Sequence, residues 1–153
     1  MKIVELIKPE LINLNLVAVK KCPAIREVAD LLQNDPRILD FKKFYGELLE
    51  RERIYTTSVG NELAFPHARI DQLTDMVVAV GRSVAGVDFE DNGLSTVKLI
   101  FIIGTPKKMV TDYLRLVGGL ARILKHSDVR SQLLKASTTA EFISIIEEAE
   151  GKI

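Results

Sequence analysis

The sequence predicts an α/β domain of three layers, in which helices flank a mixed central sheet on both faces. Helical patterns occupy the first and last thirds of the chain, and strand patterns lie between them. The run at residues 97–103 is almost continuously apolar, which is typical of a strand that is buried on both faces. A covered sheet is the simplest layered arrangement for this order of elements.

Two helices are expected before the strands. Four apolar residues between positions 25 and 32 follow helical spacing, and Pro23 suits the first turn, where its missing N–H costs little. Asp35-Pro36 then interrupts the chain. The second helix has a single apolar stripe, and Asp40 is placed to cap it. The members of this stripe are Phe41, Phe44, Tyr45, Leu48 and Leu49.

The middle of the chain predicts strands and loops. Residues 54–67 contain several poor helix formers, and residues 76–80 and 97–103 are candidates for strands. Asp91-Asn92-Gly93 between these two candidates is a turn signal.

The last third predicts helices again. An apolar stripe runs through residues 110–124, and Gly118-Gly119 in its middle indicates close packing against a neighbour, because each glycine costs a helix about 1 kcal/mol. Ser127 is expected to cap a short helix that runs to residue 134. Thr138 and Glu141 form a capping box at the start of the last helix.

Length and composition indicate one domain, residues 1–153, in a reducing compartment. The chain is 47% hydrophobic and 27% charged, which is typical of soluble globular proteins. Its 21 basic and 21 acidic residues balance, so it lacks the broad positive charge of a nucleic-acid-binding domain. The lone cysteine, Cys22, allows no intrachain disulfide, and the apolar runs are too short to span a membrane. The expected location is therefore the cytoplasm.

His67 is the best candidate for a chemical role. Pro66 fixes the backbone before it, and a neutral imidazole has one unprotonated ring nitrogen that can act as a nucleophile. The guanidinium groups of Arg51 and Arg69 are suited to holding a phosphoryl group. By spacing alone, a packed or exposed structural histidine is the more common case. The second histidine, His126, stands at an expected helix end, where an exposed or capping role is the simpler interpretation.

The residues around His67 stand in a specific order. Residues 48–69 contain an Arg-Glu pair, a loop with threonine and glycine, and then the sequence Ala64-Phe65-Pro66-His67. Gly86-Val87-Asp88-Phe89, the strand end Ile103-Gly104-Thr105-Pro106 and the helix after it follow. Together these motifs resemble the type-2 enzyme IIA family of the bacterial phosphotransferase system (PTS), the fructose–mannitol branch, which includes stand-alone nitrogen-regulatory IIA-like proteins. The resemblance covers nearly the whole chain and implies a mannitol-IIA-like fold.

This resemblance implies a phosphoryl carrier. In the family, the histidine matching His67 accepts a phosphoryl group from the phosphohistidine of HPr, and either passes it to a IIB component or uses it as a regulatory signal. Arg51 matches the arginine of the Arg-Glu pair, and Thr57 matches the loop threonine. In-line transfer between nitrogens depends on positioning and charge, so no metal or cofactor is expected. The expected partners are an HPr-type phosphocarrier protein and a IIB component or regulatory target, without nucleic acid or membrane insertion.

The chain departs from the family pattern at three positions. The family usually carries a second histidine where this chain has Tyr113. Its hydroxyl can hydrogen-bond a phosphoryl oxygen or the His67 ring, although it cannot become a cation at neutral pH, and Tyr113 can equally be a packing residue. Ser58 and Glu62 stand where small residues, often glycine, are common. The charge of Glu62 opposes an anion unless it points away or pairs with Arg69 or Arg53.

Three functions therefore stay open at the level of the sequence. The first is phosphoryl transfer in sugar uptake. The second is a regulatory protein that binds targets according to its phosphorylation state, which the missing second histidine and the isolated domain favour mildly. The third is a docking module that retains the fold without efficient transfer, and only Glu62 and Tyr113 support it.

Overall fold

A six-stranded mixed sheet forms the centre of the molecule. The computed structural model describes residues 2–90, 93 and 96–153, so Asp91 and Asn92 of the expected turn lie outside the described residues. The strand order is β1-β5-β6-β3-β2, and β4 also pairs with β6. The strands are β1 (Ile12–Asn13), β2 (Ser58–Gly60), β3 (Leu63–Ala64), β4 (His67–Ile70), β5 (Val77–Asp88) and β6 (Thr96–Pro106).

The long strand β6 organises this sheet. On one side it pairs antiparallel with β5, and on the other side it pairs in parallel with β3 and then with β4. Leu63 lies opposite Leu99 in the first of these parallel pairings, and His67 lies opposite Ile103 in the second. No other described strand pairs with β4, so His67 lies at an edge of the sheet.

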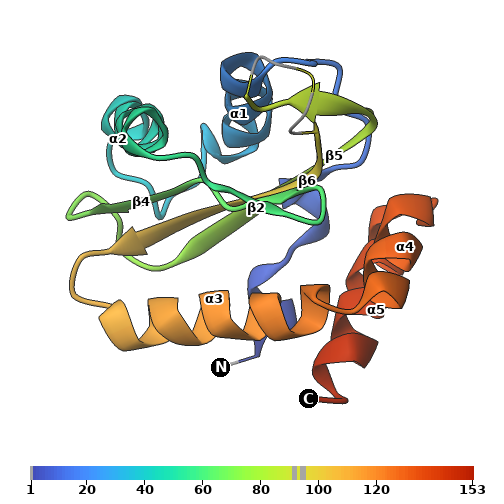
Figure 1. Ribbon diagram of the computed structural model, residues 1–153. Helices are drawn as coiled ribbons and strands as arrows, with labels where there is room; N and C mark the ends of the chain where they lie inside the picture. Colours follow the sequence, from blue (N-terminus) through green and yellow to red (C-terminus); the bar gives the residue numbers. More distant parts are fainter. Residues whose placement is uncertain (1, 91–92, 94–95) are drawn as a thin grey trace.

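Helices cover both faces of the sheet, as predicted (Figure 1). Residues of β6 alternate between the two cores: Leu99, Phe101 and Ile103 face one, and Ile100 and Ile102 face the other. The helices α1 and α2 lie over the second core, and α3, α4 and α5 pack on the first. Their bounds are α1 (Lys21–Ala29), α2 (Phe41–Ile54), α3 (Val110–Leu124), α4 (Ser127–Lys135) and α5 (Thr139–Glu150), and the short 3-10 segments are η1 (Ile3–Leu6), η2 (Pro9–Leu11) and η3 (Asp30–Leu32).

The helix starts follow the predicted capping residues in two of three cases. The Asp40 carboxylate accepts the Lys43 N–H at 3.1 Å at the start of α2, and the Thr138 hydroxyl accepts the Glu141 N–H at 3.1 Å at the start of α5. The expectation that Ser127 caps α4 was wrong. Only two residues separate α3 from α4, so Ser127 is already the first helical residue, and His126 takes the capping position without a side-chain bond.

Two glycines allow close contacts between layers. A Cβ atom at Gly119 would lie 2.5 Å from Cδ1 of Ile3. The close packing expected for the pair Gly118-Gly119 is therefore found at Gly119 and not at Gly118. A Cβ atom at Gly104 would lie 2.6 Å from the ring of Phe44. Because Gly104 lies opposite Ala68 of β4, this contact brings α2 down onto the strand that carries His67. Among the described residues, no helix is long and apolar enough to cross a membrane.

Candidate functional site

His67 is held at the beginning of the edge strand β4. The alternation of the strand buries Ala68 and Ile70, and it leaves His67 partly and Arg69 fully on the accessible side. The preceding carbonyl, that of Pro66, accepts the Ile103 N–H at 2.9 Å. The backbone at His67 is therefore fixed to β6 although its side chain is accessible.

A main-chain carbonyl sets the state of the His67 ring. Nδ1 of His67 lies 3.0 Å from the carbonyl oxygen of Phe65. A carbonyl can only accept a hydrogen bond, so Nδ1 carries the proton and Nε2 of the neutral ring keeps its lone pair. The Phe65 ring stacks on Phe101 with centroids 5.7 Å apart, which anchors this carbonyl in the core. The geometry thus leaves Nε2 as the ring atom with the free lone pair.

Tyr113 of α3 faces the same histidine. The two ring centroids lie 5.8 Å apart at an interplanar angle of 45°. Burial raises the pKa of the Tyr113 hydroxyl above its ordinary value, and the positive charges of Arg51 and Arg69 offset this only in part. Tyr113 also packs against the core beneath α3. The packing role that the sequence left open is therefore observed, and the ring also lies beside His67; a hydrogen bond from its hydroxyl to a phosphoryl group stays a prediction.

Two guanidinium groups complete the positive side of this arrangement. Arg51, in the last turn of α2, donates from Nη1 to the Tyr55 carbonyl at 2.7 Å, and Arg69 donates from Nη2 to the Lys107 carbonyl at 3.0 Å. The positive charges of both groups favour the ionised form of the Tyr113 hydroxyl, so both lie near enough to Tyr113 to influence it. Within the described parts of the chain, neither is in an ion pair with a carboxylate. Their charge is therefore available to an anion near His67.

Thr57 joins the site through its backbone. It lies in the segment between α2 and β2, and its carbonyl accepts the Phe65 N–H at 3.1 Å. Its side chain is 5% exposed, and the hydroxyl oxygen has no hydrogen-bond partner among the described residues. The neighbouring hydroxyl of Thr56, by contrast, is engaged with Glu52 and with the Ser58 N–H.

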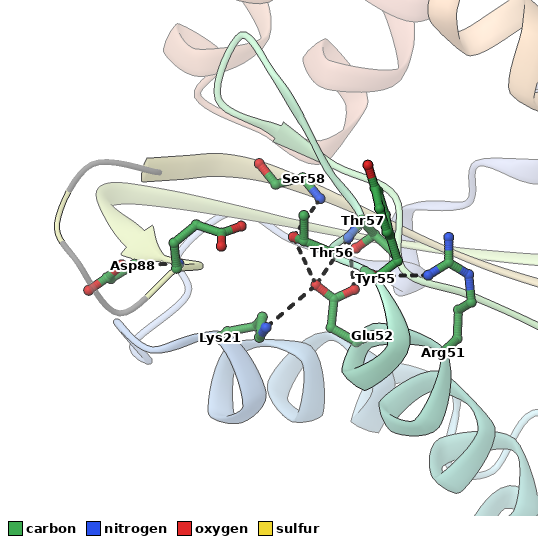
Figure 2. Close-up of polar contacts among 9 residues, drawn as sticks. Lys21, Arg51, Glu52, Tyr55, Thr56, Thr57, Ser58 and Asp88 are labelled. Atoms are coloured by element: carbon green, nitrogen blue, oxygen red, sulfur yellow. Dashed lines mark hydrogen bonds and ion pairs between the residues drawn. The ribbon is translucent and has the colours of Figure 1, made fainter.

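Glu52 is a residue that reasoning from the sequence undervalued. Figure 2 shows its carboxylate between α1 and the segment that follows α2. It accepts the Thr57 N–H with both oxygens, at 3.1 and 3.0 Å, and lies 3.9 Å from Nζ of Lys21. A signal was present in the sequence: Glu52 continues the buried stripe of Phe44 and Leu48 at intervals of four residues. A charged residue on a buried helical face needs hydrogen-bonding partners, so its place in this stripe indicates that Glu52 has a specific structural role.

Glu62 does not oppose the site. Its carboxylate lies 3.6 Å from Nζ of Lys98, and Arg53 pairs with Glu50 instead. The pairing with Arg69 or Arg53 that the sequence left open is thus replaced by a pairing with Lys98. Glu62 adopts a φ of 63° in the turn after β2, a conformation that suits glycine better. This fits the expectation that a small residue is common there.

Comparison with known proteins identifies the family of this chain. Residues 5–149 match the family described as "Phosphoenolpyruvate-dependent sugar phosphotransferase system, EIIA 2". A PTS fructose-specific EIIA component of Haloferax volcanii is 35% identical over 140 residues, which cover 88% of this chain and 91% of that protein. The crystal structure of the nitrogen regulatory protein IIA-Ntr of Neisseria meningitidis has a TM-score of 0.85 and 25% identity, and the match covers 94% of this chain and 98% of that one.

The mannitol branch shows the same fold. The crystal structure of IIA mannitol from Escherichia coli has a TM-score of 0.79 at 20% identity, with 91% of this chain and 97% of that chain covered. The same protein in complex with phosphorylated enzyme IIB gives 0.80 at 19% identity, with 92% and 96% covered. The relatives thus include sugar-specific and nitrogen-regulatory proteins. The chain belongs to the EIIA 2 family of the phosphoenolpyruvate-dependent phosphotransferase system and is a phosphoryl-carrier component of that system.

Proposed function

We propose that His67 is the phosphoryl acceptor and that Nε2 is the atom that reacts. One observation carries the proposal: Nδ1 of His67 donates to the Phe65 carbonyl at 3.0 Å, so the lone pair resides on Nε2. A nucleophile needs its lone pair fixed in direction, and the anchored carbonyl supplies this without any further base.

The donor in this proposal is the phosphohistidine of an HPr-type phosphocarrier protein. Nε2 of His67 attacks the phosphorus, the new N–P bond forms as the donor's N–P bond breaks, and the donor imidazole leaves with the electron pair of that bond. Nδ1 keeps its proton throughout, so the step needs no proton transfer and no cofactor. Catalysis then consists of positioning and of charge stabilisation.

Four residues are proposed to bind the phosphoryl group. Arg51 and Arg69 supply positive charge, which matches the oxygens that gain charge in the transition state. Tyr113 supplies a neutral O–H donor, because a tyrosine hydroxyl keeps its proton at neutral pH, and burial raises the pKa of this one further. Thr57 supplies a second hydroxyl that has no partner in the described residues before the phosphoryl group arrives.

The receiver that we propose is a IIB component of a sugar permease. The fructose-specific EIIA component at 35% identity supports this choice, and so does the solved complex of mannitol IIA with its phosphorylated IIB. A regulatory target protein is the alternative receiver of the signal, because the fold is equally that of a nitrogen regulatory protein. We place the protein in the cytoplasm as one domain of residues 1–153, where both kinds of partner are accessible.

Intact mass measurement tests the acceptor. The protein is incubated with phosphoenolpyruvate, enzyme I and HPr under conditions that preserve acid-labile phosphohistidine. Wild type and His126→Ala should each gain one phosphoryl group, and His67→Ala should gain none. His126 is the matched control because it is the other histidine and lies exposed at the start of α4. Phosphorus NMR of the product distinguishes substitution on Nε2 from substitution on Nδ1.

Two outcomes would redirect the proposal. Phosphorylation of His67→Ala would move the acceptor elsewhere. Absence of phosphorylation in wild type, with HPr itself phosphorylated, would favour a docking module that keeps the fold without the transfer, for which the replacement of the family's second histidine by Tyr113 is the supporting observation. Transfer of the group from the phosphorylated protein to a fructose-type IIB domain would favour the transport role over the regulatory one.

A further inference from the structure

We propose that Glu52 is a positioning residue, whose buried carboxylate orients the His67 ring through the backbone of Thr57 and Phe65. The proposal rests on the phosphoryl-carrier role of His67 and adds to it the residue that holds the reactive ring in place. Glu52 itself does not touch the phosphoryl group.

The environment of Glu52 is unusual for a carboxylate. The residue is 3% exposed and continues the apolar stripe of α2, where Phe44 and Leu48 precede it. Burying a charge costs several kcal/mol unless hydrogen bonds and an opposite charge compensate it. The compensation comes from the Thr57 N–H, the Thr56 hydroxyl at 3.4 Å and Lys21. An apolar side chain would fill the same position in the stripe, so the bonds to residues 56 and 57 are what a glutamate adds there.

A short series of hydrogen bonds leads from this carboxylate to the imidazole. Glu52 accepts the Thr57 N–H, the Thr57 carbonyl accepts the Phe65 N–H at 3.1 Å, and the Phe65 carbonyl accepts the His67 Nδ1–H at 3.0 Å. Each contact restrains one peptide group of Thr57 or Phe65, and the next contact is made by the adjacent peptide group of the same residue. Loss of the first contact is therefore expected to loosen Thr57 and, through its bond to the Phe65 N–H, the orientation of the Phe65 carbonyl, even though the Phe65 ring stays stacked on Phe101.

The remaining contacts of this segment explain why the effect should fall on the ring and not on the fold. Phe65 keeps its stacking on Phe101, and the Pro66 carbonyl keeps its bond to the Ile103 N–H. The strand β4 therefore stays in register when Glu52 is changed. A displacement of a reacting group by about 1 Å can cost about a hundredfold in rate, so a small loosening is enough to be measured.

Glu52→Gln is the variant that tests this, because it keeps the shape and one acceptor oxygen but removes the charge and the second acceptor. Glu27→Gln is the matched control. Glu27 also extends from a helix to a loop, where its carboxylate accepts the Val17 N–H and the Ala18 N–H, but it does so beside β1, at the opposite edge of the sheet from β4. If Glu52 only connected a loop to a helix, as Glu27 does, the two variants should behave alike.

Two measurements are made on each variant. The first is the single-turnover rate of phosphoryl transfer from phosphorylated HPr, which should fall about tenfold or more in Glu52→Gln and stay unchanged in Glu27→Gln. The second is the ring ¹⁵N NMR spectrum of unphosphorylated His67. It should show the Nδ1–H tautomer in wild type and Glu27→Gln, and a mixture with the Nε2–H tautomer in Glu52→Gln. Both are run at a temperature where chemical denaturation shows each variant to be fully folded.

An unchanged tautomer in Glu52→Gln would overturn the proposal, whatever the transfer rate. A slow rate with that unchanged spectrum would assign Glu52 a merely structural role. Should Glu52→Gln not fold, Glu52→Asp, which withdraws the carboxylate by one methylene group, gives the same two readouts. If wild type accepts no phosphoryl group from HPr, the proposed function fails, while the ring spectra still decide whether Glu52 positions His67.

Discussion

Replacement of Thr57 by valine is expected to raise the stability of the protein while it slows phosphoryl transfer. The Thr57 side chain is buried, and its hydroxyl oxygen has no hydrogen-bond partner in the part of the chain that the structure describes. A buried hydroxyl without a partner costs about 1–3 kcal/mol, because it has given up its bonds to water. Valine has the same branched shape, with a methyl group in place of the hydroxyl.

The expected gain in the free energy of unfolding is about 1 kcal/mol, at the lower end of that range, because some relaxation of the hydroxyl in the native state is expected. For a chain of this size, such a gain corresponds to about 2–4 °C in Tm. The backbone bonds of Thr57 to Glu52 and Phe65 are retained, so the position of the segment should not change. The transfer rate should fall nonetheless, because the phosphoryl group loses one donor.

Thr56→Val is the matched control one residue earlier. The Thr56 hydroxyl donates to Glu52 at 3.4 Å and accepts the Ser58 N–H at 3.2 Å. Its loss should lower the free energy of unfolding by about 1 kcal/mol. The same substitution at neighbouring positions is thus expected to act with opposite sign. Urea denaturation followed by far-UV circular dichroism measures both effects, and the transfer rate is measured on the same samples.

A lower urea midpoint for Thr57→Val would refute the reasoning on stability, since it would show that the hydroxyl has a partner in the native protein, such as an ordered water. An unchanged transfer rate would remove Thr57 from the proposed phosphoryl-binding residues, even if the stability rose as expected. The two parts of the prediction can therefore fail separately.

Three further predictions concern other parts of the molecule. Tyr113→Phe should slow transfer from phosphorylated HPr without a comparable loss of stability, and an equal rate would exclude the hydroxyl from the site. Arg82 is buried and donates to four main-chain carbonyls, one directly after β1 and three at the end of α4, so Arg82→Met should lower the urea midpoint by an amount equivalent to about 2–4 kcal/mol. Hydrogen bonds from Arg37 hold the pKa of the Asp35 carboxyl below its ordinary value, so its stabilisation is complete above the unfolded-state pKa of about 3.9 and is lost as the pH falls through the lower native-state pKa. Asp35→Asn should therefore reduce the loss of stability in acid, measured by urea denaturation across that range, and an identical pH profile would contradict this.

The layers of the fold could be predicted because their signals are local. The stripe of α2 and the apolar run within β6 each bury a pattern that is complete within one element. The capping residues Asp40 and Thr138 act within three residues of themselves, and both were predicted correctly. Where a boundary depended on the neighbouring element, as at Ser127, the local rule was insufficient.

The pieces that the sequence did not predict are short and held by distant partners. The strand β1 has two residues and exists because Ile12 pairs with Val80 of β5. The strand β3 is equally short, and its place beside β6 depends on Leu63 lying opposite Leu99. Two residues carry no periodicity, so a pattern cannot indicate them. The N-terminal segment is similarly fixed from far away, by the Glu150 carboxylate that accepts the Ile3 N–H at 2.6 Å.

In the candidate site, too, features carried by local sequence motifs could be predicted, and features that depend on distant main-chain contacts could not. The order of motifs around His67 could be read from the sequence. Its closeness to Tyr113 was one of two alternatives that the sequence left open, and the structure places the two rings side by side. The role of the Phe65 carbonyl as the acceptor for His67 Nδ1 could not be predicted, because every residue has a main-chain carbonyl and the sequence does not distinguish one from another. The partners of Glu52 depend on how the segment after α2 returns to its own helix, which no spacing rule describes.

The exchange of the family's second histidine for Tyr113 is understandable from the charges around it. A histidine at that place offers an N–H donor and, when protonated, a positive charge. Tyr113 offers the donor alone, since a tyrosine hydroxyl is neutral at physiological pH and burial raises its pKa further. In the proposed site, Arg51 and Arg69 are the residues expected to supply the positive charge that a phosphoryl group needs, and neither is neutralised by a carboxylate in the described residues. Two guanidinium groups stay charged at every physiological pH, whereas a histidine does not. A site built on them would need only a hydrogen bond from position 113, which is the role that we propose for the hydroxyl of Tyr113.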